Sequence, residues 1–507
     1  MASKDSLLPP FTHTPVESIS ALHSTVVSTF ASHLTRPLEY RLVQLRKLYW
    51  GIKDHEKDIL EACARDLGKP QYETYLTEIG WCLNDIIYVC KNLEKWAKEE
   101  KPTGIDFIHL ATRPRIRKEP LGAVLVLGAY NFPIQLSLGP FIGAIAAGCT
   151  AILKPSENAP NAAAVMQKII EERLDTRAYK CVQGGIPESS ALLDCKWDKI
   201  FYTGGANVGV IVSKKAAETL TPVTLELGGR NPAIVTRHAN LRLAARRLLW
   251  AKGMNAGQIC VSQNYILIDK DVLPTFLEQF KIALKEFYPN GVRESEDYGR
   301  IVNEKQWSRL KKMLDETHGK ILIGGTMDAS TKYLEPTVVQ VTDPSDSLLT
   351  EESASDPLGV YPFGTRAETE KILDRTRSGG ASVNDGFYHA SIPTLEFGGV
   401  GESGQGSYRG KASFDCFTHR RAVTSTPGWV ERLLDIRYPP YKGKIETFKR
   451  MAEQKPNFDR EGKVKRAGLV WLVLALGGET AAGGLKRWIV LLSIVGARQW
   501  LLQMGRL

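Results

Sequence analysis

The residues of this 507-residue chain that best suit covalent chemistry are a cysteine and a glutamate, each next to a predicted turn. Cys260 ends the peptide Asn255-Ala-Gly-Gln-Ile-Cys260, after a predicted helix over residues 241–252. Glu226 lies in Leu225-Glu-Leu-Gly-Gly229, a predicted strand that enters a glycine turn. A thiol can attack a carbonyl carbon, and a carboxylate can activate the water that releases the product. A lone cysteine after Gly-Gln would more often be a buried structural residue, so the surrounding elements decide.

These elements alternate between strand and helix. Apolar runs at 122–128 and 151–154 predict strands buried on both faces, with helices at 136–148 and 162–174 and strands at 179–182 and 199–202. The alternation predicts a doubly wound α/β sheet behind a helical layer at 15–99. After Glu226 the pattern repeats, with strands at 232–235, 265–268 and 321–323 and a helix at 274–287, so a second α/β domain should carry Cys260.

Polar residues and glycines follow these strands. Asn131 comes after the first strand, Lys154 and Glu157 end the second, and Thr203-Gly-Gly-Ala-Asn-Val-Gly209 opens a helix that runs to about residue 219. Ligands of such sheets bind at the carboxyl ends of strands, and a glycine turn lets a phosphate approach a helix N-terminus. The turn is neither GxGxxG nor a P-loop, because Val210 replaces the P-loop lysine. Alone, it fits a tight turn without a ligand equally well.

Composition narrows the class of protein. The length predicts two or three domains, and 43% hydrophobic with 24% charged residues indicates a globular chain. Eight scattered cysteines without CxxC pairs or metal-type spacing indicate reduced, intracellular thiols and no metal site. The net charge of +10 comes partly from the last fifth of the chain, and no nucleic-acid motif accompanies it.

Seven peptides occur in the order seen in aldehyde dehydrogenases, and the chain resembles that family over about residues 15–440. They are Tyr130-Asn-Phe-Pro133, Leu153-Lys-Pro-Ser-Glu157, Thr203-Gly-Gly205, Leu225-Glu-Leu-Gly-Gly229, Gly257-Gln-Ile-Cys260, Val383-Asn-Asp385 and Phe397-Gly-Gly-Val-Gly401. The Lys-Pro-Ser-Glu peptide and Arg437-Tyr-Pro-Pro440 are similar to the class 3, fatty-aldehyde branch.

The resemblance implies an aldehyde dehydrogenase-like fold of two doubly wound α/β domains with a small β extension for oligomerisation. Residues 1–100 and 119–228 would form the NAD-binding domain, and 229–414 the catalytic domain. Residues 101–118 and 415–440 would supply oligomerisation strands, so a homodimer is expected.

The resemblance also implies roles for the three reactive residues. Cys260 would be the nucleophile, and Glu226 would activate the water that hydrolyses the thioester. The side-chain amide of Asn131 and the backbone N–H of Cys260 would hold the oxyanion, contributing roughly 3–4 kcal/mol each.

A nicotinamide cofactor is implied as well. Its adenosine ribose would meet Lys154 and Glu157, and the cofactor set is completed by Gly204, Gly205, Ala206, Asn207, Val208 and Gly209 at the pyrophosphate, with Leu227 and Glu352. Glu352 stands where the family binds the nicotinamide ribose. The Glu157 carboxylate would accept a hydrogen bond from a 2′-hydroxyl and repel a 2′-phosphate, so NAD is favoured and NADP is possible.

After Glu352 the sequence departs from the family pattern. The chain runs directly through residues 353–356 into Pro357-Leu-Gly-Val-Tyr361. About twenty residues of the pattern, a strand and a helix, are missing, which should uncover apolar neighbours. Our hypothesis is a spliced or mis-predicted form of a normal enzyme. Sequencing the transcript tests it, and a continuous message without the segment would contradict misprediction.

Residues 441–507 are expected to form a basic linker and a hydrophobic, membrane-associating tail. The apolar runs at 467–478 and 488–497 are each shorter than the ~20 residues of a spanning helix. The preceding lysines and arginines suit an anionic cytoplasmic lipid surface. We therefore expect the protein to associate with the cytoplasmic face of the endoplasmic reticulum membrane. If the tail only covers the dimer and does not insert, we expect a cytoplasmic protein.

The expected function is NAD-dependent oxidation of a long apolar aldehyde, fatty or isoprenoid/apocarotenoid, to its acid through a cysteine thiohemiacetal and thioester. One rival is a non-catalytic, membrane-bound paralogue that acts in binding or assembly, which the shortening after Glu352 favours. The other is a soluble, general aldehyde dehydrogenase. Turnover of a long-chain aldehyde distinguishes the expected enzyme from the non-catalytic paralogue. Carbonate extraction of membranes distinguishes it from the soluble enzyme.

Overall fold

The structure is a computed structural model, and it describes residues 8–350, 359–454, 456–464 and 487–496. The chain forms two compact units, Met1–Thr103 with Arg115–Val423, and Gly104–Pro114 with Thr424–Leu507. All predicted site residues belong to the first unit, and Glu352 lies outside the described residues.

A six-stranded sheet in the order β15-β6-β5-β2-β3-β4 confirms the predicted doubly wound arrangement. Its parallel strands are β2 (Ala123–Leu127), β3 (Thr150–Lys154), β4 (Tyr179–Cys181), β5 (Lys199–Gly204) and β6 (Val223–Leu227). The short strand β15 (Gly404–Gln405) adds to β6 in antiparallel fashion. Every residue of β2 and β3 is buried, as the continuous apolar runs predict.

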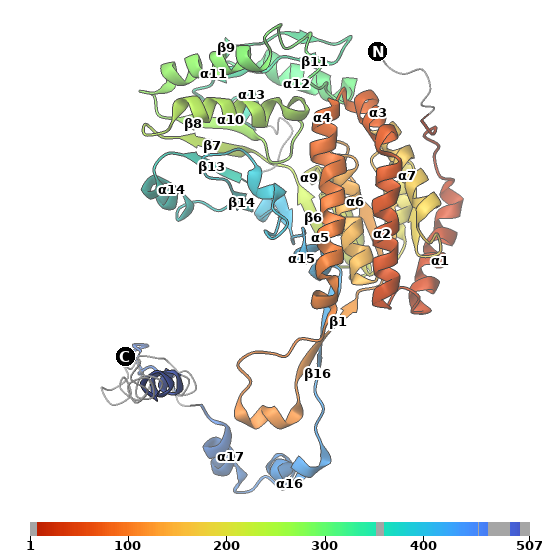
Figure 1. Cartoon of the computed structure of the whole chain (residues 1–507), viewed down its shortest axis with the longest axis vertical. Helices are drawn as coiled ribbons and strands as arrows, with labels where there is room; N and C mark the ends of the chain where they lie inside the picture. The colour runs from red at the N-terminus through yellow and green to blue at the C-terminus, as the bar shows by residue number, and fades with distance from the viewer. Residues whose placement is uncertain (1–7, 351–358, 455, 465–486, 497–507) are drawn as a thin grey trace, which may run out of the picture. The chain divides into compact units, whose positions relative to one another are not determined.

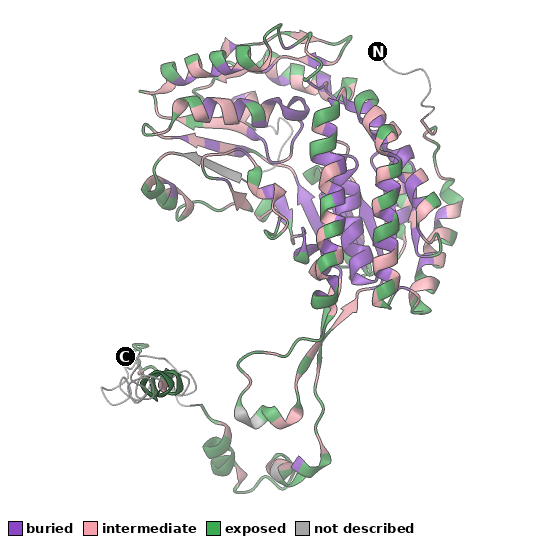
Figure 2. Cartoon of the chain, in the orientation of Figure 1, coloured by how far each residue is buried: buried purple, intermediate pink, exposed green. Residues whose placement is uncertain are grey.

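Helices cover both faces of this sheet. On one face lie α6 (Gln135–Ala147) and α7 (Pro160–Arg173), and over them pack α2 (Leu38–Asp54), α3 (Glu56–Leu67) and α5 (Gly80–Ala97). On the other face lie α1 (Ile19–Ala31), α8 (Ile186–Asp194) and α9 (Ala206–Glu218). Figure 2 shows the deepest burial in the sheet and α6, whose residues are all buried. This core fixes the strand ends that carry the site.

A second, four-stranded parallel sheet in the order β14-β13-β7-β8 carries the cysteine. Its strands are β7 (Asn231–Val235), β8 (Gln263–Ile268), β13 (Gly359–Phe363) and β14 (Gly380–Ala381), with α10 (Leu241–Gly253) and α11 (Leu273–Phe287) packed on each other. Strand β9 (Lys320–Ile323) pairs with β12 (Val338–Gln340) in a separate antiparallel pair. The predicted second α/β sheet is thus confirmed.

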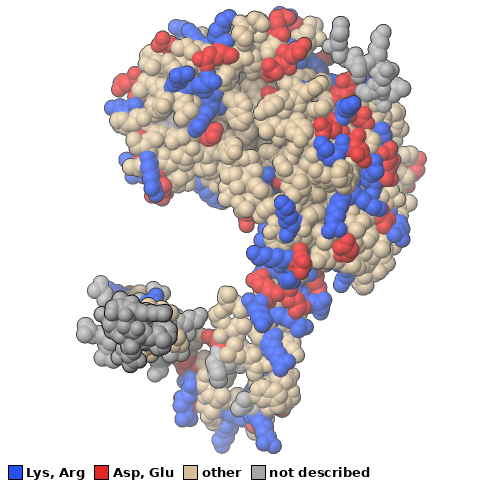
Figure 3. All heavy atoms as spheres, in the orientation of Figure 1, with Lys and Arg blue, Asp and Glu red and all other residues tan. Residues whose placement is uncertain are grey.

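The first unit also contains a separate two-stranded ribbon. Strand β1 (Arg115–Pro120) pairs antiparallel with β16 (Thr418–Val423), and the pair overlaps the segments 101–118 and 415–440 that are expected to supply oligomerisation strands. Opposite charges line it, for example Arg421 3.2 Å from Glu119, and Figure 3 shows both signs gathered there. The ribbon is where an oligomerisation extension is expected.

Among its described residues, the second unit includes the short helices α16 (Glu431–Leu434) and α17 (Lys444–Ala452) and a helical stretch over 487–496. Helix α17 exposes Ile445, Phe448 and Met451, which recur every third residue. Among the described residues, none of the helices combines the length and the apolar character needed to cross a membrane. The predicted apolar run at 467–478 lies outside the described residues.

Candidate active site

Cys260 and Glu226 come from different sheets and meet beside one tyrosine. Glu226 lies on β6, whereas Cys260 lies between the turn Met254–Gly257 and β8. Tyr408 is buried, which raises the pKa of its phenol, and the charges of Glu226 and Cys260 raise that pKa further. The two predicted reactive groups are therefore close to the same phenol, across more than thirty positions of sequence.

The backbone leading to Cys260 is left-handed at three successive residues. Asn255 has φ 52°, Ala256 φ 51° and Gly257 φ 78°. This conformation costs alanine roughly 1–2 kcal/mol, so surrounding contacts must hold it. The side-chain amide of Asn255 donates to the carbonyls of Asn131 (2.7 Å) and Gln258 (3.1 Å). From β7, Asn231 Nδ2 donates to the carbonyl of Cys260 at 3.0 Å.

Asn131, the predicted oxyanion donor, contacts the loop that carries Cys260. Its Nδ2 donates to the Gln258 carbonyl at 3.1 Å. Because an amide nitrogen carries two hydrogens, Asn131 can make this contact and still donate to a substrate oxygen. The Asn131 side chain is thereby oriented by the same peptide that carries Cys260.

The Glu226 carboxylate is buried, with 3% of the residue exposed. Within the described residues neither of its carboxylate oxygens has a hydrogen-bond partner. Desolvation by burial raises its pKa well above the ordinary value of a glutamate. A structural capping carboxylate would accept backbone N–H groups, and this one accepts none in the described structure. A buried carboxylate without a hydrogen-bond partner in the described structure is instead typical of a general base.

A pocket opens at Cys260, and most of its lining is apolar. The apolar side chains that line it include Trp81, Phe132, Leu136, Ile259, Val261, Phe387 and Phe397. Sequence reasoning missed Trp81, Phe387 and Tyr408, because nothing in their spacing relates them to Cys260. Only packing of α5 and the segments after β14 against the cysteine loop reveals the pocket. Such a lining suits an aldehyde with an apolar body.

Most of the residues predicted to hold a cofactor lie at or just after the carboxyl ends of β3 and β5, while Leu227 ends β6 and Glu352 lies outside the described residues. Lys154 Nζ donates to a Glu157 carboxylate oxygen at 2.6 Å, and the carboxylate is partly exposed. A Cβ at Gly205 would have no atom within 4 Å, and Ala206, Asn207 and Val208 are exposed at the start of α9. The exposed helix start and the partly exposed Glu157 carboxylate fit the phosphates and ribose of a dinucleotide.

Two further observations support that fit. Thr203 Oγ1 at the end of β5 is buried and, in the part of the chain that the structure describes, has no hydrogen-bond partner. A Cβ at Gly209 would approach Leu227 Cδ2 to 2.6 Å, so this glycine lets α9 pack closely on β6. Gly204 and Leu227 sit at paired positions of β5 and β6.

Comparison with known proteins places the chain in a family. The profile of the aldehyde dehydrogenase family matches residues 17–368. The chain is 49% identical to beta-apo-4'-carotenal oxygenase of Neurospora crassa, over 97% of this chain and 98% of that protein. It is 38% identical to a dimeric, NADP-preferring aldehyde dehydrogenase of Canis lupus familiaris, over 85% and 99%. The solved substrate-bound state of Staphylococcus aureus AldH covers 85% of this chain and 99% of its own, with TM-score 0.83 and 37% identity. This chain therefore belongs to the aldehyde dehydrogenase family and is an enzyme of it.

Proposed function

We propose that the enzyme oxidises a long apolar aldehyde, of the apocarotenoid or fatty class, to its carboxylic acid with a nicotinamide dinucleotide. The observation that carries this proposal is the largely apolar pocket at Cys260, with Glu226 and Asn131 close by. The name of the Neurospora relative, a carotenal oxygenase, supports the apocarotenoid class.

In this proposal Cys260 attacks first. Its thiolate forms a bond to the carbonyl carbon, and the carbonyl oxygen becomes an oxyanion that accepts from the Asn131 amide and the Cys260 backbone N–H. A bound nicotinamide would supply the acceptor for the hydride that leaves the aldehyde carbon. Glu226 then takes a proton from water as the water oxygen attacks the thioester carbonyl. The carbon–sulfur bond breaks, and the acid and the Cys260 thiolate separate.

A panel of aldehydes of increasing length, from short alkanals to an apocarotenal, tests the proposal. We expect kcat/KM to rise with apolar length, because each buried CH₂ contributes about 0.8 kcal/mol. A flat profile would favour a general aldehyde dehydrogenase instead. Absence of turnover with every aldehyde would favour the non-catalytic alternative.

Glu157 is proposed to set the preference between NAD and NADP. Glu157→Gln should remove the repulsion of a 2′-phosphate, and the ratio of kcat/KM for NADP to that for NAD should rise about tenfold, or 1.4 kcal/mol. Steady-state kinetics with both cofactors measures it. Glu172→Gln, a surface change on α7, is the control. An unchanged ratio in Glu157→Gln would assign specificity elsewhere.

We further propose a homodimer built on the ribbon of β1 and β16 and membrane attachment through residues 441–507. The dimeric relative and the exposed charged ribbon support the first. The exposed apolar residues of α17, beside basic neighbours, support the second. Removing residues 441–507 should release the enzyme from membranes to the supernatant without loss of the dimer in sedimentation, and either opposite result contradicts its part.

A further inference from the structure

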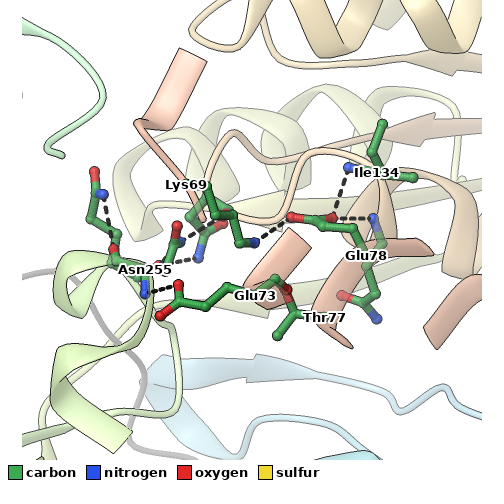
Figure 4. A network of polar contacts seen from close by, with 9 residues as sticks. Lys69, Glu73, Thr77, Glu78, Ile134 and Asn255 are labelled. Atoms are coloured by element: carbon green, nitrogen blue, oxygen red, sulfur yellow. Dashed lines mark hydrogen bonds and ion pairs between the residues drawn. The ribbon is translucent and has the colours of Figure 1, made fainter. Parts of the chain in front are cut away.

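Two carboxylates on one short segment contact both halves of the proposed active site. The segment consists of α4 (Gln71–Thr74) and the π-helical turn η2 (Tyr75–Ile79), between α3 and α5. Glu73 lies in α4 and Glu78, five residues later, in the π-helical turn, and their carboxylates contact different segments of the chain. Figure 4 shows Glu73 directed at Asn255 and Glu78 directed at Ile134.

Glu73 contacts the loop of the cysteine. One of its carboxylate oxygens accepts the backbone N–H of Asn255 at 2.8 Å. Asn255 is the first of the three left-handed residues that lead to Cys260, and its side chain contacts the Asn131 carbonyl. Because a left-handed alanine is unfavourable on its own, an external acceptor at the start of the turn stabilises the conformation. Glu73 is the charged group in this position.

Glu78 contacts the peptide that follows Asn131, on the other side of the proposed active site. Its Oε2 accepts the N–H groups of Ile134 (3.1 Å) and Gln135 (2.9 Å), which follow Asn131 and begin α6. Its Oε1 accepts from Lys69 Nζ at 2.7 Å, and both side chains of this pair are fully buried. The Lys69 ammonium also lies 4.2 Å from the Phe132 ring centre. The same segment therefore anchors the peptide that carries Asn131.

We propose that Glu73 is a positioning residue of the reaction: its carboxylate holds the left-handed turn that places the Cys260 thiol against Asn131, while Glu78 holds Asn131 in register. The proposal rests on the proposed role of Cys260 as the nucleophile. The positioning role of Glu73 requires a side-chain oxygen within hydrogen-bond distance of the Asn255 N–H.

The surroundings of Glu73 make the contact sensitive to pH. Burial raises the pKa of Glu73 to about 7, against the lowering effects of the Asn255 N–H and Lys69, and Asp297 raises it further. The phenols of Tyr288 and Tyr298 also face it. Above a pH of about 7 Glu73 is the charged, stronger acceptor, and below it the protonated, weaker one. The turn should therefore be held less firmly as the pH falls through this value.

Release of p-nitrophenolate from p-nitrophenyl acetate, measured without cofactor, reports attack by the thiol alone. Glu73→Gln keeps an acceptor of the same length, so its rate at a pH of about 8 should stay within about threefold of wild type. Glu73→Asp keeps the charge but shortens the side chain by one methylene, and its rate should fall about tenfold to a hundredfold. The same two changes at Glu61, which pairs with Arg65 on the surface of α3, should leave the rate unchanged.

Each outcome has one meaning. Wild-type rates in Glu73→Asp, or an equal loss in Glu73→Gln and Glu73→Asp, overturn the positioning role. If Glu73→Asp does not fold, the pH dependence of Glu73→Gln decides: the wild-type to Gln rate ratio should fall as the pH is lowered through about 7, and a constant ratio overturns the proposal. Cys260→Ala tests the role of Cys260 separately from the role of Glu73. Continued release of p-nitrophenolate in that variant would contradict Cys260 as the nucleophile and would leave the contact of Glu73 with Asn255 unaffected.

Discussion

Replacement of Cys260 by alanine is expected to lower aldehyde oxidation by at least about a thousandfold, since Cys260 is the only thiol among the described residues that line the pocket. The pocket should remain, because hydrogen bonds of Asn131, Asn231 and Asn255 hold the loop. Formation of the acid from the preferred long aldehyde, followed by chromatography, measures the effect.

Cys195→Ala is a suitable thiol control. Cys195 lies at the end of α8 and does not line the pocket, so its removal should leave the rate unchanged. Activity of Cys260→Ala above about one per cent of wild type would mean that the reaction does not pass through a Cys260 thioester.

Glu226→Gln is expected to lower kcat about a hundredfold to ten-thousandfold, the range for loss of a general base. The amide has nearly the same volume and leaves the buried site intact, but it cannot take a proton from water. Acylation of Cys260 should still occur, so mass spectrometry of the protein during turnover should find the chain heavier by one acyl group. Rapid acid formation without an accumulated adduct would contradict the assignment.

Glu226 should also determine how the rate of aldehyde oxidation falls at low pH. Burial raises the Glu226 pKa, so the basic carboxylate form exists only above that raised value. Activity should therefore rise with pH through the Glu226 pKa and be lost as the pH falls below it. In Glu226→Gln the residual rate should lack this dependence, and a retained profile would assign it to another group.

Much of the positioning framework follows from the sequence because it is local. The apolar runs of β2 and β3 predict strands buried on both faces, and the polar residues at their ends converge because parallel strands end together. The resemblance to aldehyde dehydrogenases, and not this pattern, predicts one site for Cys260, Glu226 and Asn131. In the structure Asn131 donates to the Gln258 carbonyl in the loop of Cys260, and Glu226 and Cys260 both lie near Tyr408.

The pocket and its supports could not be predicted in the same way. Trp81, Phe387 and Tyr408 come from three distant segments, and Glu73 reaches Asn255 across 182 positions of sequence. Such contacts depend on tertiary packing, which leaves no periodic signal in the chain. The left-handed conformation of Ala256 likewise has no signal in the sequence, because neighbouring contacts impose it.

The sequence departs from the family pattern after Glu352, and the described structure resumes at residue 359. Residues 351–358 lie outside the described part of the chain, and directly after them β13 pairs in parallel with β7. The second sheet is therefore continuous from β14 to β8. The alignment with the Neurospora relative spans 520 positions, more than this chain has residues, so the relative contains residues that this chain lacks.

The antiparallel strand β15 gives the first sheet a dependence on the order of synthesis. Gly404 pairs with Glu226 and Gln405 with Leu225, and the ring centres of Tyr408 and Phe201 are 5.2 Å apart. On the ribosome, β2 to β6 emerge long before these partners, so the edge of β6 stays open while the second sheet is made. The sheet edge that carries Glu226 is closed only after residue 408 has left the exit tunnel, so a chain stalled earlier presents that edge to chaperones or to other chains.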